Sequence, residues 1–121
     1  MRDYRMKLDV KFEPLQLIDV RAEAAAVTDR WMNQTLTAVN DSVVRLGVVE
    51  GEFHWHAHAA EDEFFLVLDG ELKVEIEAGE TFVLGPGQGL TVPRGVVHRT
   101  SAPVRTAVVM VEPATVVPVG D

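Results

Sequence analysis

The chain has 121 residues, 47% apolar and 25% charged, which fits one globular domain with a sizeable core. Its formal net charge is -8, and residues 50–80 hold ten of the nineteen acidic residues beside one lysine, so nucleic acid and anionic membranes are not expected as partners. No apolar run approaches the roughly 18 residues of a membrane span, and the charged N-terminus does not resemble a secretory signal. The lack of cysteine excludes disulfides and thiolate ligands and fits a reducing compartment, so we expect a cytoplasmic protein.

Residues 1–42 are expected to form an N-terminal arm and a helix. Residues 8–18 read as an extended segment. The stretch Asp19–Asn40 is rich in alanine at its start and free of glycine and proline, which indicates a helix with Asp19 as its N-cap. Val27 and Trp31 would share one buried face, but the threonine and asparagine content of the second half also allows a short helix followed by a strand.

Residues 43–112 read as short strands separated by glycine, proline and aspartate, a pattern typical of a sandwich or barrel. The Asp69–Gly70 pair between two apolar runs predicts a β-hairpin. Residues 113–121 contain two prolines and are expected to pack as an extended tail. The expected strands are Val43–Val49, Phe53–His58, Glu63–Leu68, Glu71–Glu77, Thr81–Leu84, Gly89–Val92, Val97–Ser101 and Val104–Glu112.

Three of the four histidines lie on one expected strand, Phe53–His58. Alternate side chains of a strand share a face, so His54, His56 and His58 would all point the same way. Two imidazoles spaced two residues apart on a strand can reach the same ion. The sequence therefore predicts the start of a metal site on this strand.

A carboxylate and a fourth imidazole can complete that site. Glu63 begins the next expected strand after a short loop, and His98 follows the turn at residues 93–95. A barrel would return this late strand to the neighbourhood of the first histidines. Three imidazoles and one carboxylate suit a single divalent ion of zinc, iron, nickel, manganese or copper.

The spacing of these residues resembles the two motifs of the cupin superfamily, a group of small β-barrel proteins. The first motif has glycines on either side of two histidines and a glutamate, and it matches Gly51, His56, His58, Glu63 and Gly70. The second joins a glycine, a Pro-x-Gly turn and a histidine, and it matches Gly87, Pro93, Gly95 and His98. Ala102 stands where that motif has an asparagine, which is not a metal ligand in the family.

The resemblance covers nearly the whole chain and is strongest to small bacterial cupins often labelled mannose-6-phosphate isomerase-like, a label that describes fold and no demonstrated activity. It implies an all-β, cupin-type double-stranded β-helix (a jelly-roll barrel) with a short N-terminal helix and arm. It also implies one domain over 1–121, with the arm and helix at 1–42, the barrel at 43–112 and the tail at 113–121. The implied metal ligands are His56, His58, Glu63 and His98.

Two functions follow from such a site. Four protein ligands leave coordination positions open, so the chain is either a metal-dependent enzyme acting on a small polar metabolite, of isomerase or dioxygenase type, or a non-catalytic module that binds or senses a small molecule. His54 is the candidate catalytic acid or base. It shares the alternate positions of His56 and His58 on the expected strand and would therefore face the cavity, although it could equally sit at the barrel rim. A cluster of polar barrel residues without a metal is the alternative reading of the four ligands.

The apolar residues of the N-terminal arm suggest self-association. An arm of this kind could complete the sheet of a second copy and cover its edge, so we expect a homodimer. These residues are Leu8, Val10, Phe12, Leu15, Leu17 and Ile18.

Overall fold

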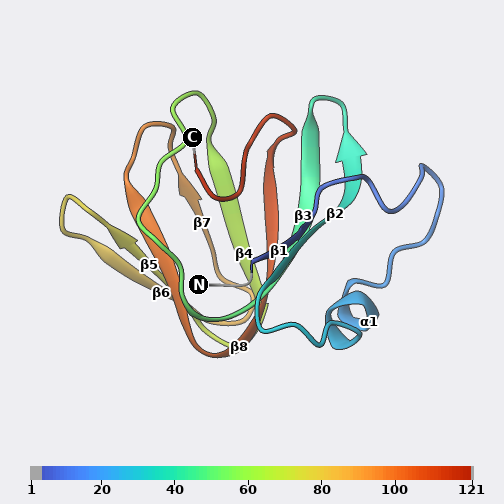
Figure 1. The fold of residues 1–121 in the computed structure, drawn as a ribbon, viewed down its shortest axis with the longest axis horizontal. Coiled ribbons are helices and arrows are strands. Elements are labelled where there is room, and N and C mark those ends of the chain that lie inside the picture. Colours follow the sequence, from blue (N-terminus) through green and yellow to red (C-terminus); the bar gives the residue numbers. More distant parts are fainter. Residues whose placement is uncertain (1–3, 121) are drawn as a thin grey trace.

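The computed structural model describes residues 4–120, so expectations for residues 1–3 and 121 lie outside the described residues. Over the described part the fold is mostly β-strand with one short helix (Figure 1). The elements are β1 (Arg5–Lys7), α1 (Val20–Ala25), β2 (Met32–Val39), β3 (Ser42–Glu52), β4 (Glu63–Asp69), β5 (Leu72–Ile76), β6 (Thr81–Leu84), β7 (Gly89–Val92) and β8 (His98–Pro113).

The strands form one curved, mixed sheet in the order β1-β2-β3-β8-β4-β7, with β5 joined to β8 and to β6. Figure 1 shows the strands bending around a shared interior while α1 lies outside them. This is the expected cupin-type barrel. The strands expected at Thr81–Leu84 and Gly89–Val92 match β6 and β7.

β8 is the longest strand and links the two ends of the barrel. Its first residues pair with β5 and its last residues pair with both β3 and β4. The sequence predicted two strands here, Val97–Ser101 and Val104–Glu112. That division is wrong, because β8 is one strand from His98 to Pro113. Pro103, which cannot donate a ladder hydrogen bond, is accommodated within it because residues 103–105 take part in none of these pairings.

The hairpin predicted at Asp69–Gly70 is also wrong. β4 and β5 do not pair with each other; each pairs with a different part of β8. The hydroxyl of Thr106 on β8 accepts a hydrogen bond from the Glu71 N–H at 3.0 Å, and its single proton lies between the carbonyls of Val104 at 2.8 Å and Glu71 at 3.1 Å. Gly70 has a φ of +93°, and a Cβ there would stand 2.4 Å from the Thr106 hydroxyl, so the turn needs glycine in order to pack against β8.

The long helix over Asp19–Asn40 is replaced by the alternative, a short helix followed by a strand. The side chain of Asp19 caps α1 by accepting from the Ala22 N–H at 3.0 Å, as expected. Residues from Met32 pair with β3 on one side and β1 on the other. These tertiary hydrogen bonds outweigh the weak helix propensity of the threonines and asparagine in this stretch.

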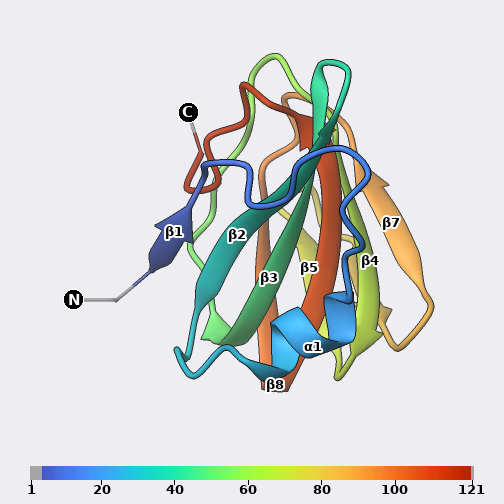
Figure 2. The ribbon, with the colours of Figure 1, turned by 90° about the vertical axis from the view of Figure 1, so that its right-hand side faces the viewer.

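The two ends of the described part of the chain fold onto their own barrel. β1 runs parallel to β2, and the arm continues beside it through the N–H groups of Lys11 and Phe12, which donate to carbonyls of β2 (Figure 2). The C-terminal tail is not the extended segment expected, because it turns twice, at Val116 and Gly120.

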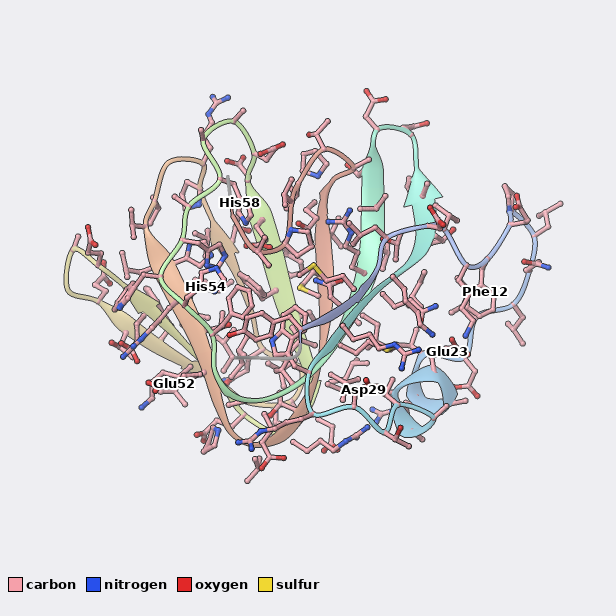
Figure 3. The ribbon with its side chains drawn as sticks, in the orientation of Figure 1. Phe12, Glu23, Asp29, Glu52, His54 and His58 are labelled. Carbon is pink, nitrogen blue, oxygen red and sulfur yellow. The ribbon has the colours of Figure 1, made fainter. Side chains whose placement is uncertain are left out.

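The sheet buries a different apolar cluster on each face. The outer cluster lies under α1, with Phe12 also packed against it (Figures 2 and 3). It consists of Ala24, Val27, Met32, Leu36, Leu46, Val48 and Ala107. The inner cluster consists of Phe65, Val67, Leu72, Val74, Leu84, Val92, Val108 and Met110. Within residues 4–120, no helix has the length and apolar character to cross a membrane.

Candidate metal centre

His56, His58, Glu63 and His98 meet at one place in the barrel interior. Each offers a ligand atom, and these four atoms lie within 4.8 Å of one another. The Glu63 Oε1 atom is 3.6 Å from His58 Nε2 and 3.4 Å from His98 Nε2. Two ligand atoms each about 2.1 Å from one ion stand roughly 3–4 Å apart, so these spacings fit a shared metal.

Backbone pairing explains why residues 42 positions apart in the sequence come together. The N–H of His56 donates to the His98 carbonyl and the N–H of His98 donates to the His56 carbonyl, both at 2.9 Å. The Gly95 N–H then donates to the His58 carbonyl at 2.8 Å. The turn before β8 is therefore fastened to the segment that carries the first two ligands.

Local hydrogen bonds orient two of the imidazole rings. His56 Nδ1 lies 3.0 Å from the carbonyl of His54, and His98 Nδ1 lies 2.9 Å from the carbonyl of Val96. A carbonyl only accepts, so each Nδ1 carries the proton and donates it. The Nε2 lone pair of each neutral ring is thereby left for an ion.

The charge states of these rings differ. Burial is the main cause that lowers the pKa of His56 to about 4, so this ring is neutral at pH 7. Burial also acts to lower the pKa of His98, but the Glu63 carboxylate and the Val96 carbonyl outweigh it and raise the pKa above its usual value. A proton on His98 is thus stabilised by Glu63, and an ion would have to displace it.

The hydrogen bonding of the ligand atoms in this cluster also fits a bound cation. The Oε1 atom of Glu63 and the Nε2 atom of His98 are buried and 3.4 Å apart, and aside from this ion-pair contact they have no hydrogen-bond partner among the described residues. Buried polar atoms are almost always paired, so unpaired atoms that converge on one point fit a ligand there. This arrangement of three imidazoles and a carboxylate could hold one divalent metal; its identity is not fixed by the geometry.

A second buried carboxyl group lies beside Glu63. Phe64 faces Val111 in the pairing of β4 with β8, so Glu63 and Glu112 are next to each other on the inner face. Burial and the nearby Glu63 raise the pKa of Glu112 to about 8, against the opposing effect of Arg45. Arg45 Nη1 stands 3.6 Å from a Glu112 oxygen and the two side chains are fully buried. Glu112 therefore holds its proton more tightly than an ordinary carboxyl group does.

A small cavity of about 40 Å³ opens against the cluster, and His56 and Glu63 both line it. Its wall is otherwise largely apolar and, among the described residues, contains no lysine or arginine. The remaining lining residues are Trp31, Asn33, Gly47, Val49, Phe53, Phe65, Leu72, Thr100, Val108, Met110 and Pro118.

The strand expected at Phe53–His58 is not regular. Only His56 forms a β-bridge, so the alternation that put three histidines on one face does not hold along this segment. His54 is exposed, its Nε2 atom lies 2.7 Å from the Val119 carbonyl, and it lines neither the cluster nor the cavity. Figure 3 marks His54 and His58 at different levels of this segment. The predicted catalytic role of His54 stays a prediction.

Sequence reasoning missed Asn33 and Glu112 as interior residues. Asn33 was assigned to a helix, where its neighbours gave no sign of a cavity. The sequence does hold a signal for Glu112. It is the one acidic residue of an otherwise mainly apolar strand, and by alternation it falls on the same face as the buried Val108 and Met110.

Comparisons with known proteins agree with this architecture. The family model described as a cupin domain matches residues 35–113. The protein YdbB of Bacillus subtilis (strain 168), called uncharacterized, is 44% identical over 91 residues, which are 75% of this chain and 80% of that protein.

Solved structures show the same fold. A cupin-2 domain protein from Shewanella frigidimarina is 30% identical, with a TM-score of 0.76 over 80% of this chain and 94% of that one. A Ralstonia eutropha JMP134 protein provisionally described as a mannose-6-phosphate isomerase is 20% identical, with a TM-score of 0.69 over 81% of this chain and 97% of that one. With its barrel, its two motifs and this match over most of its length, the chain belongs to the cupin domain family.

Proposed function

We propose that this protein binds one divalent transition metal, of zinc, iron, nickel, manganese or copper, and uses it to hold a small-molecule substrate. The ligands would be His56, His58, Glu63 and His98. The observation that carries this proposal is the buried convergence of four ligand atoms at the wall of a cavity. Four protein ligands leave one or two positions on such an ion for the substrate.

The lining of the cavity favours a dioxygenase-type reaction over an isomerase-type one. A bound ion would supply Lewis-acid polarisation and, in the case of iron, redox chemistry. Isomerisation by proton transfer also needs an acid or base that is not a ligand. Among the described lining residues, the titratable ones are His56 and Glu63, which both belong to the cluster. Outside the cavity wall, His54 and the buried Glu112 beside Glu63 are the remaining candidates for such a group.

The substrate we infer is small and less polar than the sequence suggested. A cavity of about 40 Å³ has room for roughly three water-sized groups. Its wall offers no cationic side chain to a phosphate group, so the name of the Ralstonia protein does not extend to this chain's substrate. A compact ligand with one metal-binding end fits these features.

The alternative is a non-catalytic cupin that binds or senses a small molecule through the same ion. The two functions differ in product formation. An enzyme converts a compound from a metabolite panel, and an iron-dependent dioxygenase consumes oxygen as it does so. A binding module is stabilised by its ligand and leaves it unchanged.

Elemental analysis of protein purified without a histidine tag tests the metal centre. We expect about one metal per chain in the native protein and none in His56→Ala/His98→Ala. Equal, negligible metal in both proteins after incubation with each of the five ions would refute the proposal. Oxygen uptake by the iron(II)-loaded protein, measured across the metabolite panel, then tests the reaction type.

We also propose a cytoplasmic location and small-molecule partners, with no nucleic acid or membrane partner. The cysteine-free composition and the net charge of -8 support this.

A further inference from the structure

We propose that Asn33 is the polar anchor of the cavity: its side-chain carbonyl accepts a hydrogen bond from an O–H or N–H group at the far end of a short carboxylate whose carboxyl group binds the metal. The inference rests on the proposed metal centre. It concerns a residue of β2 that lies outside both cupin motifs.

Asn33 is buried without a complete set of partners. Its side chain belongs to a residue that is only 4% exposed, and its Oδ1 atom has no hydrogen-bond partner among the described residues. A buried carbonyl in this state destabilises the fold, because it has lost water and gained nothing in return. An amide kept in this condition on the wall of a cavity is explained by a ligand that pairs with it.

The space in front of Asn33 is open because Gly47 stands across from it. These two residues are Cα partners in the pairing of β2 with β3, and both line the cavity. A Cβ at Gly47 would stand 3.0 Å from the terminal methyl of Met110, so even a methyl group would narrow this space. Gly47 has an ordinary negative φ, so its backbone does not demand glycine. The absent side chain is therefore a matter of room in the cavity.

The neighbouring amide provides a natural contrast. Gln34 follows Asn33 on β2 and, by strand alternation, points to the opposite face, where it lies beside the N-terminal arm and outside the cavity wall. It is also buried, at 8% exposure. Both residues thus carry a buried side-chain amide, and the main difference is that Asn33 faces the cavity and Gln34 does not.

The dimensions and chemistry of the cavity define the ligand class. The wall between the cluster and Asn33 is largely apolar and carries no cation, so the single anionic group of the ligand must be at the metal. About 40 Å³ accommodates roughly three water-sized groups beyond it. Two methylene groups followed by a hydroxyl match this volume. A short hydroxycarboxylate, or an equivalent with a terminal N–H, is the class that fits.

Cobalt(II)-loaded protein tests the assignment through its visible absorption spectrum, which responds to ligands at the ion. The probes are propanoate and 3-hydroxypropanoate, which differ by one terminal hydroxyl. We expect the native protein to bind 3-hydroxypropanoate about fivefold more tightly, the usual contribution of one neutral hydrogen bond. Asn33→Leu should abolish this preference, and Gly47→Ala should reduce it by crowding the amide.

Two matched variants serve as controls. Gln34→Leu alters the amide that faces the other way, and Thr100→Val removes the other uncharged polar side chain of the wall. Both should keep the native preference. A preference that survives in Asn33→Leu, or that disappears in Thr100→Val instead, would overturn the assignment.

The outcomes separate this inference from the proposed metal centre. Failure of the native chain to take up cobalt refutes the metal centre itself. Stoichiometric cobalt with no binding of either probe, or with equal binding of both, refutes only the role of Asn33. Thermal unfolding gives an independent readout: ligand-free Asn33→Leu should unfold at the native temperature or higher, since an amide with an unpaired buried oxygen is replaced by an apolar group. A clearly lower unfolding temperature would mean that the amide has a structural role and would overturn the inference.

Discussion

The two faces of β2 and β3 bury side chains of opposite character. On the outer face, under α1, the two strands contribute Met32, Leu36, Leu46 and Val48 to an apolar cluster. On the inner face the alternate positions are Asn33, Thr35, Arg45 and Gly47. The same alternation thus supplies a stabilising core on one side and a set of desolvated polar groups on the other.

The inner face itself divides into a paired part and an open part. Arg45 donates from Nε to the Thr35 hydroxyl at 3.0 Å and from Nη1 to the Val116 carbonyl at 2.9 Å, and it lies beside Glu112. Asn33 and Glu63, by contrast, each keep an oxygen without a hydrogen-bond partner among the described residues. On β2 and β3, the outward side chains contribute to the apolar core, whereas the inward side chains include polar groups that we propose are retained for a ligand.

Leu46→Ala should have the largest effect on stability. Leu46 is fully buried in the outer cluster, and truncating such a leucine typically costs about 2–5 kcal/mol in the free energy of unfolding. Urea denaturation followed by circular dichroism measures this. The variant should retain the native metal stoichiometry at low temperature, because the cluster of ligands is on the other face. A loss of metal in protein that is still folded would show that the two faces are coupled.

His98→Ala should have the largest effect on metal binding. It removes one proposed ligand of the metal. Loss of a residue that only hydrogen-bonds to a ligand typically costs about 10–100-fold in metal affinity, so we expect the loss of a ligand itself to cost more than about 100-fold. Competition with a chromophoric chelator measures the dissociation constant. His54→Ala is the matched control, because this exposed imidazole lies outside the four-residue cluster. An equal loss of affinity in the two variants would place His54 among the ligands and refute the cluster as described.

The position of His98 shows what could be predicted from the sequence. The motif spacing brought His56, His58, Glu63 and His98 together correctly, because a Pro-x-Gly turn and an H-x-H pair constrain the chain locally. The alternation argument for His54 failed, since the segment Phe53–His58 contacts β8 through one isolated β-bridge and one further backbone hydrogen bond, without a continuous ladder.

The errors elsewhere share one physical origin, which is long-range pairing. The Asp69–Gly70 pair does lie between two strands, but β4 and β5 on either side of it each pair with β8 instead of with each other. Likewise, no local pattern reveals that Asn33 faces Gly47, because this depends on the register of two strands. Local patterns could therefore predict several of the strands, and the motif spacing could predict the four-residue cluster, but neither could predict the wall of the cavity.

Metal affinity should fall as the pH is lowered. His98 has a raised pKa, so below that value a proton competes with the ion for its Nε2 atom. Affinity should then decrease by up to about tenfold per pH unit, as expected for the displacement of one proton. His56, with a pKa of about 4, adds no such dependence above that pH. Chelator competition at several pH values measures the slope, and an affinity that does not change below neutral pH would contradict the interaction between His98 and Glu63.

The smallest expected effect concerns self-association through the N-terminal arm. Leu15 and Leu17 in the N-terminal arm are 106% and 93% exposed, and β1 forms the edge of the sheet, so we propose that two copies associate through this arm. Leu17→Ser should weaken the dimer several-fold, because burying a leucine fully contributes roughly 1.5–3 kcal/mol and an interface buries it only in part. Size-exclusion chromatography with light scattering measures this, with the exposed Val83 on β6 changed to serine as the control. A native protein that is monomeric at micromolar concentration would refute the proposal, and the exposed leucines would then belong to the surface of a single barrel.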